Sequence, residues 1–108
     1  MQDIEANWSP IEKKTAREAF DKAYRREISA LIEQVRVKAG DMGELEELWT
    51  LHDFLSAKRH ELDGKYDYSY EVLPFVFANL IKDGWLNLDE LKDLKPDKRA
   101  KIAALTRM

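Results

Sequence analysis

Apolar side chains recur at helical spacing over the first forty residues of the chain. The segment Ser9-Pro10-Ile11-Glu12 precedes this pattern and has the form of a capping box, with Ser9 as N-cap and Glu12 as the third helical residue. Gly40 follows the pattern and is a typical stop signal. The apolar positions in between are Ala16, Phe20, Ala23, Tyr24, Ile28, Leu31, Ile32, Val35 and Ala39. The pattern predicts one helix of about 29 residues, roughly 44 Å long.

A second long helix is expected directly after the first. Asp41-Met42-Gly43-Glu44 offers another capping box, and helical spacing continues from about Gly43 to Asp63, with Gly64 as the stop. The connection between the two helices is short. They are therefore predicted to form an antiparallel hairpin over residues 9–64.

Residues 65–108 predict shorter helices that form a small C-terminal head. Asp67 or Ser69 can cap a helix that ends at Gly84, and Pro74 must be accommodated in its first turns or as a kink. This helix would carry the apolar run of the segment YEVLPFVFANLIKDG.

Two further helices complete the prediction. Asn87-Leu88-Asp89-Glu90 can cap a short helix that stops before Pro96, and a last helix runs from Pro96 to about Arg107. No stretch of the chain alternates convincingly with period two. Residues 1–108 are therefore predicted to be a single all-α domain.

The apolar stripes of the two long helices bear on the oligomeric state. An isolated pair of helices cannot bury both stripes, and the first helix extends past its shorter partner. A symmetric dimer that pairs two hairpins into a helical bundle would solve this problem, and we expect one. The alternative is a monomer in which the C-terminal third folds back over the stripe.

Charge and composition exclude several function classes. Charged residues make up 36% of the chain and the formal net charge is −3, so no overall basic field attracts nucleic acids or acidic membranes. Basic residues of the first helix are interleaved with acidic ones, which is typical of a solvated face. We expect no nucleic-acid partner.

Cysteine usage and apolar runs bear on the compartment. The absence of cysteine excludes disulfides and thiolate metal sites and fits a cytosolic protein. The longest apolar run is about four residues, far short of a membrane span. The N-terminal residues MQDIEANW lack the basic and apolar regions of a signal peptide.

The stretch LWTLHDFLSAKRHELDGKYD, residues 48–67, carries the most varied chemistry. On a helix, Leu45, Leu48, Leu51, Leu55 and Leu62 share one arc, which we expect to be a core or an interface. His52 and Arg59 fall inside that arc. The side chains next to the arc on the helix surface are Trp49, Asp53, Ser56 and His60.

An arginine within a leucine arc has two interpretations. In the first, Arg59 forms a structural ion pair that closes the bundle, and Trp49 fills the core. In the second, Arg59 and Trp49 are exposed and bind a protein partner, because arginine and tryptophan are enriched at binding hot spots. The spacing alone leaves both open.

Catalytic and metal sites are less consistent with the same stretch. Asp53, Ser56 and His60 share a helix face, but a straight helix supplies neither an oxyanion hole nor a substrate pocket. His52 and His60 lie roughly 12 Å apart along a helix axis, too far to bind one ion. His60 and Asp63 offer at most half a metal site. We expect no enzymatic activity, no small-molecule substrate and no metal.

The same stretch, followed by FVFANLIKDG, resembles the fluorescence recovery protein family of cyanobacteria, and the resemblance extends from about Trp8 to Leu105. It implies an all-helical homodimer, formed through long helices, that is not an enzyme and has no cofactor. Members bind the orange carotenoid protein, mainly its C-terminal domain in the light-activated red form. They speed its return to the orange form and its release from the phycobilisome, so that antenna fluorescence recovers. The implied location is the cytoplasmic face of the thylakoid membrane.

The resemblance also implies roles for individual residues. Partner binding falls to Trp49, His52, Asp53 and Arg59, and in the head to Phe75 and Lys101. Leu48 matches a dimer-interface leucine, and the interface is expected to include Leu45, Trp49 and Leu55. Relatives outside cyanobacteria leave an alternative function open, a dimeric helical adaptor for a different protein partner.

Overall fold

The computed structural model describes residues 4–108 of the chain. The regular elements in that range are all helical: η1 (Ile4–Asn7), α1 (Pro10–Gly40), α2 (Leu45–Lys65), α3 (Leu73–Lys82), η2 (Leu88–Leu91) and α4 (Pro96–Thr106). The predicted all-α class is confirmed for these residues, as is the order of two long helices followed by shorter ones. No helix in the described range is long and apolar enough to cross a membrane.

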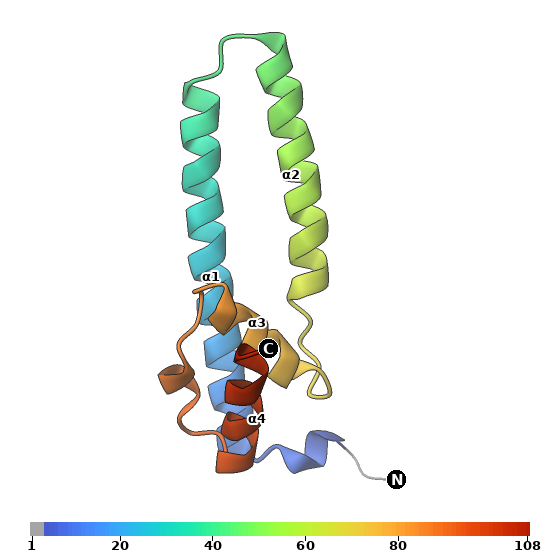
Figure 1. The fold of residues 1–108 in the computed structure, drawn as a ribbon, viewed down its shortest axis with the longest axis vertical. Helices are drawn as coiled ribbons and strands as arrows, with labels where there is room; N and C mark the ends of the chain where they lie inside the picture. The colour runs from blue at the N-terminus through green and yellow to red at the C-terminus, as the bar shows by residue number, and fades with distance from the viewer. Residues whose placement is uncertain (1–3) are drawn as a thin grey trace.

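The molecule is elongated, with principal extents of 56 × 29 × 26 Å. Figure 1 shows α1 running along its length, with α2 antiparallel to the second half of α1 and the shorter helices against the first half. We call residues 28–65, the second half of α1 with α2, the arm. Residues 4–27 with 66–108 are called the base. The base thus combines the predicted head with the first half of α1.

The hydrophobic core lies in the base. Leu73, Phe77 and Leu80 of α3 are completely buried, as are Ala16 and Ala23 of α1. The other buried apolar residues are Trp8, Ala19, Phe20, Val76, Ala78, Leu86, Leu91, Leu94 and Ile102. By contrast, α2 contributes no buried residue. Because burial of apolar surface contributes roughly 25 cal/mol per Å², the base supplies most of the folding stability of the isolated chain.

Several local signals in the sequence produce the expected structure. The Ser9 capping box is present: the Glu12 N–H donates to Ser9 Oγ (3.2 Å) and the Ser9 N–H donates to Glu12 Oε1 (3.0 Å). Asn87 and Glu90 form a second capping box, although the helix they start is 3₁₀ rather than α. Pro74 is accommodated in the first turn of α3. Gly84 ends α3 with φ of 85°, a conformation that glycine adopts without steric cost.

The capping box predicted at Asp41 is wrong. Asp41 ends α1 instead, since its N–H donates to Val37 O (3.1 Å). The next residues are needed to reverse the chain, and α2 begins only at Leu45. Glu44 is its N-cap but makes no side-chain capping bond. The Glu47 carboxylate instead accepts from the Gly43 N–H at 3.0 Å.

Two other predicted helix ends also differ. Gly64 does not stop α2, which continues to Lys65. The third helix begins at Leu73 rather than near Ser69. The reason is aromatic packing: the rings of Tyr66 and Tyr68 pack edge-on against Phe20, with centroids 5.4 and 5.0 Å away. Residues 66–69 form no helix, and their tyrosines pack against α1 instead.

Candidate functional site

The outer surface of α2 carries Trp49, His52, Asp53 and Arg59, which we call the α2 strip. Trp49 is 53% exposed and stacks edge-on against His52, with ring centroids 6.2 Å apart. His52 Nδ1 lies 3.4 Å from Asp53 Oδ1, and both side chains are exposed. Arg59 follows His52 by about two helical turns, which keeps it on the same side of α2. The helix thus presents these residues to solvent together.

The surroundings of Arg59 bear on the two interpretations of the leucine arc. It is exposed, and no carboxylate or carbonyl within residues 4–108 pairs with its guanidinium. The neighbouring Lys58 does form such a pair, with Glu61 on the same helix at 3.3 Å. The structural ion pair is therefore not formed inside the described part of the chain.

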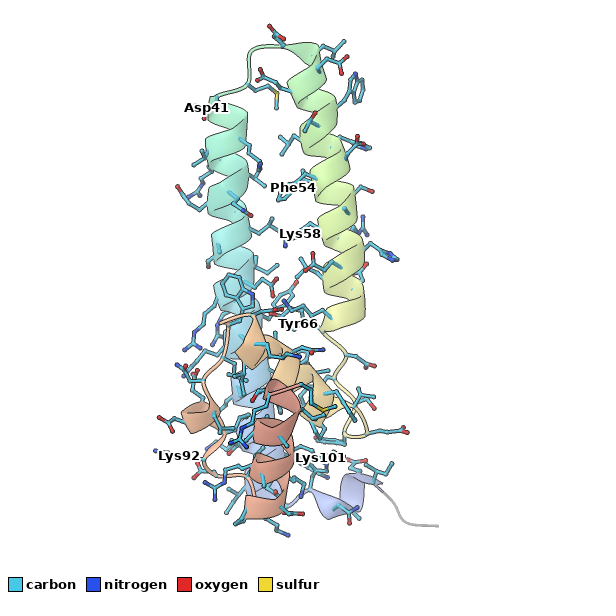
Figure 2. All side chains as sticks on the ribbon, viewed as in Figure 1. Asp41, Phe54, Lys58, Tyr66, Lys92 and Lys101 are labelled. Atoms are coloured by element: carbon cyan, nitrogen blue, oxygen red, sulfur yellow. The ribbon has the colours of Figure 1, made fainter. Side chains whose placement is uncertain are left out.

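The leucine arc of α2 is itself exposed. Leu45, Leu48 and Leu55 are 64%, 45% and 38% exposed, respectively. Figure 2 shows Phe54 and Lys58 pointing from α2 toward α1. Lys38 Nζ of α1 lies 4.9 Å from the centroid of the Phe54 ring. The two helices of the arm leave an apolar groove of about 360 Å³, lined by Leu31, Ile32, Val35, Arg36, Ala39 and Leu55.

Asp53, Ser56 and His60 do not form a catalytic arrangement. All three are exposed on α2, and Asp53 contacts His52 rather than Ser56 or His60. Ser56 is exposed on the surface of α2 and lines none of the five clefts and grooves described for this structure. Within residues 4–108, no three histidine or carboxylate side chains come together as a metal site would require.

In the base, Phe75 and Lys101 come from different helices and touch. Lys101 Nζ of α4 lies 5.2 Å from the centroid of the Phe75 ring on α3, which is a cation–π distance. Phe75 is 47% exposed although the rest of α3 is mostly buried. A half-exposed aromatic ring with a cation above it is suited to binding a protein surface.

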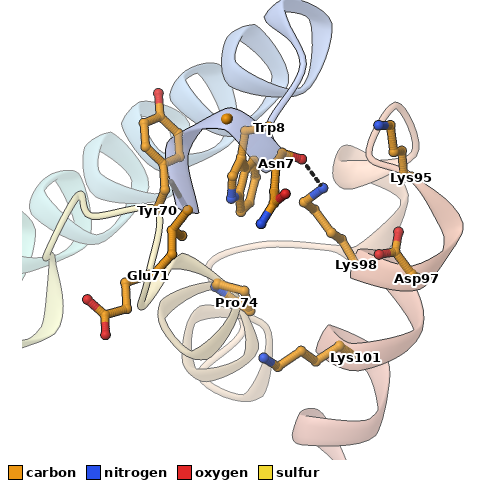
Figure 3. Close-up of a pocket in the computed structure, with 11 residues that line it drawn as sticks. Asn7, Trp8, Tyr70, Glu71, Pro74, Lys95, Asp97, Lys98 and Lys101 are labelled. Atoms are coloured by element: carbon orange, nitrogen blue, oxygen red, sulfur yellow. Dashed lines mark hydrogen bonds between the residues drawn. The ribbon is translucent and has the colours of Figure 1, made fainter. Parts of the chain in front are cut away.

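A cleft of about 640 Å³ lies beside this pair (Figure 3). Trp8, Tyr70 and Pro74 supply its apolar side, and Lys98 and Lys101 line it from α4. Lys98 is already engaged, because its Nζ donates to Asn7 O at 2.7 Å. Glu71 and Asp97 also line the cleft, so its charge is mixed. Sequence reasoning did not find this cleft.

Two buried carboxylates were also missed from the sequence. Glu12 is 1% exposed and Glu27 is 2% exposed. Both continue the spacing of Ala16, Phe20 and Ala23 on α1, and an acid at an apolar position was the signal that could have found them. Each is compensated by a lysine from a distant part of the chain.

The environment of Glu12 holds its carboxyl strongly ionised. Burial alone would raise its pKa, but the backbone N–H groups of Ser9 and Lys95 and the ammonium of Lys98 lower the pKa to about 2. The Lys95 N–H donates at 3.0 Å, and Lys98 Nζ lies 3.1 Å away. Glu12 thereby joins the start of α1 to the start of α4.

Comparison with known proteins now decides the family. A family model described as photoprotection regulator fluorescence recovery protein matches residues 8–106. The chain belongs to the fluorescence recovery protein family. The curated fluorescence recovery protein of Synechocystis sp. is 48% identical over 108 residues, which is 100% of this chain and 99% of the relative.

Solved structures of the family have the same fold. The fluorescence recovery protein of Fremyella diplosiphon is 63% identical, with a TM-score of 0.91 over 94% of this chain and 99% of that chain. The Synechocystis structure is 48% identical, with the same TM-score and the same coverage. The resemblance inferred from the sequence is confirmed, and the chain is a member of a family of photoprotection regulators.

Proposed function

We propose that this chain is a non-enzymatic regulator of the orange carotenoid protein. It binds mainly the C-terminal domain of the light-activated red form and accelerates conversion to the inactive orange form. It also promotes detachment from the phycobilisome, so that antenna fluorescence recovers. The observation that carries the proposal is the α2 strip, in which Trp49 and Arg59 are both exposed on one helix of a photoprotection-regulator family member.

The α2 strip has the chemistry of a protein-binding hot spot. Tryptophan and arginine dominate such hot spots because they combine a large contact area with directional hydrogen bonding. Since no group within residues 4–108 pairs with Arg59, its guanidinium can donate to a carboxylate of the client. His52 and Asp53 extend the strip with polar groups next to Trp49. The Phe75–Lys101 pair offers a second, smaller contact to the same client.

A homodimer is part of the proposal. Leu45, Leu48 and Leu55, together with the apolar groove of the arm, would be covered by a second copy of the chain. Trp49 belongs to the α2 strip and borders this apolar face, and so would serve both the dimer and the client. Two copies of the client site follow from the symmetry.

The mechanism rests on differential binding. A protein ligand shifts a conformational equilibrium only by as much as it prefers one state over the other. A regulator that binds a compact or intermediate form of the carotenoid protein more tightly than the open red form favours compaction. If it binds the barrier state most tightly, it also accelerates the conversion. No covalent chemistry is needed.

The proposed client sets the location. The orange carotenoid protein acts on the phycobilisome, so we place this chain at the cytoplasmic face of the thylakoid membrane. Its association with the phycobilisome would be indirect, through the client.

Complex formation tests the proposal. The purified chain is mixed with orange carotenoid protein, either dark-adapted or under continuous illumination, and each mixture is resolved by size-exclusion chromatography with light scattering. We expect a complex with the illuminated client and a much smaller amount of complex with the dark client. Absence of a complex under illumination would contradict the proposal.

A further inference from the structure

Lys65, the last residue of α2, joins three helices. Its Nζ lies 2.9 Å from Glu27 Oε1 on α1 and 2.7 Å from Asp83 Oδ2 at the end of α3. The side chains of Lys65 and Glu27 are 10% and 2% exposed. Tyr66 completes the arrangement, because its hydroxyl donates to Glu27 Oε1 at 2.7 Å. We call Glu27, Lys65, Tyr66 and Asp83 the junction cluster.

The junction cluster is held by charge and by packing. Burial opposes the charged form of Lys65, but hydrogen bonds to Asp83 and Glu27 outweigh burial and raise the pKa of the ammonium. Burial and the hydrogen bond to the Glu27 carboxylate raise the pKa of the Tyr66 hydroxyl. The Tyr66 ring also packs edge-on against Tyr24 at 5.0 Å between centroids. Lys65 therefore stays charged and Tyr66 stays neutral over the ordinary pH range.

The rest of α2 is attached much more weakly. Among the described residues, every hydrogen bond and ion pair from α2 to another helix runs through Lys65. Thr50 and Lys58 bond only within α2. Between Leu45 and Gly64, the contact of Lys38 with the Phe54 ring is the polar link to α1. Within the single chain, the ion pairs and hydrogen bonds that tie α2 to other helices therefore lie at its C-terminal end, at Lys65.

We infer that Lys65 is a positioning residue that fixes the base of α2 relative to α1 and α3. It would hold the α2 strip and the Phe75–Lys101 pair in one arrangement toward the client. The α2 strip lies on α2 in the arm, whereas the Phe75–Lys101 pair joins α3 and α4 in the base (Figure 1). A regulator that contacts its client at both needs a fixed relation between them to favour one client conformation. The consequence for activity rests on the proposed function; the geometric claim does not.

Distance measurements test the geometry without any client. The chain has no cysteine, so Thr50→Cys on α2 and Lys92→Cys in the base introduce two spin-label sites at exposed positions. The labelled protein is diluted with unlabelled protein so that distances within one chain dominate. Pulsed electron–electron double resonance then reports the distribution of distances between the labels. We expect one narrow distribution for the otherwise native chain.

The test variant is Glu27→Gln with Lys65→Met. It removes both charges together, so that no unpaired charge is left buried, and the amide oxygen of the new glutamine can still accept from the Tyr66 hydroxyl. We expect the distance distribution to broaden about twofold or more. Lys58→Met is the matched control, since Lys58 pairs only with Glu61 of its own helix. A narrow distribution in the double variant would overturn the inference.

The client assay separates positioning from simple destabilisation. We expect the double variant to bind the illuminated client within about twofold of the native affinity, while the recovery rate at saturating protein falls about fivefold or more. The single variant Lys65→Arg, with Glu27 unchanged, keeps the cation and should keep most of the native recovery rate. Native binding and a native rate in the double variant would overturn the inference and leave the proposed function standing. A native chain that does not accelerate recovery would refute the proposed function, and the distance distributions would still decide the position of α2.

Folding of the variants has its own control. If the double variant lost its helical circular dichroism, Asp83→Ala would replace it. Asp83 is half-exposed, and this change removes the contact between Lys65 and the end of α3 while leaving the Lys65–Glu27 pair in place. A broadened distribution in Asp83→Ala supports the inference, and a narrow one overturns it.

Discussion

At the scale of single residues, the buried acids of α1 are where charge and fold are most tightly linked. Burial opposes the ionised form of Glu12, yet its pKa is depressed in the folded chain because two backbone N–H groups and Lys98 stabilise the carboxylate. Its contribution to stability is fully present above the unfolded pKa of about 4.5. It is lost as the pH falls through the folded pKa of about 2.

This linkage predicts the acid stability of the chain. The difference between the folded and unfolded pKa values corresponds to about 3 kcal/mol of unfolding free energy. Glu12→Gln should therefore be less stable than the native chain at pH 7 but should lose less stability between about pH 5 and about pH 2. Urea unfolding at a constant protein concentration measures both. If the unfolding free energies of the two proteins changed in parallel with pH, the lowered pKa of Glu12 would be contradicted.

Arg59 is the residue on which client binding is expected to depend most. Arg59→Leu should weaken binding of the illuminated client by about 2 kcal/mol, roughly thirtyfold, while helicity is kept. Arg25→Leu is the matched control, because Arg25 is also exposed on a long helix and lies outside the α2 strip. Titration calorimetry compares the three proteins. Equal affinity of the native and Arg59→Leu chains would leave Arg59 without a role in binding.

At the scale of elements, glycine illustrates how far the sequence predicts helix ends. The sequence predicts a helix stop at Gly84, and α3 ends at Lys82, two residues before this glycine, which has φ of 85°. It predicts the same at Gly64, but α2 passes through that residue. The difference lies outside the local sequence, because Lys65 gains its ion pairs with Glu27 and Asp83 only if α2 extends that far.

The two glycines therefore predict opposite effects of one substitution. At neither site does any neighbouring atom lie within 4 Å of the position that an alanine methyl group would occupy, so backbone conformation decides. Gly84→Ala should destabilise the chain by about 1 kcal/mol, because alanine disfavours positive φ. Gly64→Ala should stabilise it by roughly 0.5 kcal/mol, because Gly64 lies in the last turn of α2 without positive φ and alanine has the higher helix propensity. Thermal unfolding that shifts in the same direction for both variants would contradict this account.

Helix caps and helix starts can be predicted from the sequence where residues nearby in the chain determine them. The Ser9 and Asn87 boxes and the start of α4 at Pro96 follow from residues within one turn. The late start of α3 does not, because Tyr66 and Tyr68 pack on Phe20, which is distant in the sequence. The Phe75–Lys101 contact is likewise tertiary: the family resemblance points to each residue, but nothing in the sequence pairs them.

At the scale of the whole molecule, the buried core and the exposed apolar surface lie in different parts of the chain. The base holds the core, whereas the arm exposes Leu45, Leu48 and Leu55. The sequence predicts an apolar stripe too long for one partner helix, and the structure of the single chain leaves that stripe uncovered. Exposed apolar patches of this kind mark interaction sites.

The dimer proposed for this surface has a direct test. Leu48→Glu places a charge within the apolar arc and should shift the chain from dimer to monomer at micromolar concentration, weakening association by about 3 kcal/mol or more. Because α2 contributes nothing to the buried core, the base should keep its fold. Light scattering gives the mass and circular dichroism the helicity. An unchanged dimer mass would show that the interface lies elsewhere.

The central claim is that this member of the fluorescence recovery protein family returns the orange carotenoid protein to its inactive form. The decisive measurement follows the red-to-orange absorbance change of photoactivated client in the dark, with and without equimolar chain. We predict a recovery rate about tenfold higher or more with the chain present, a barrier lowered by about 1.4 kcal/mol or more. An unchanged recovery rate would contradict the claim.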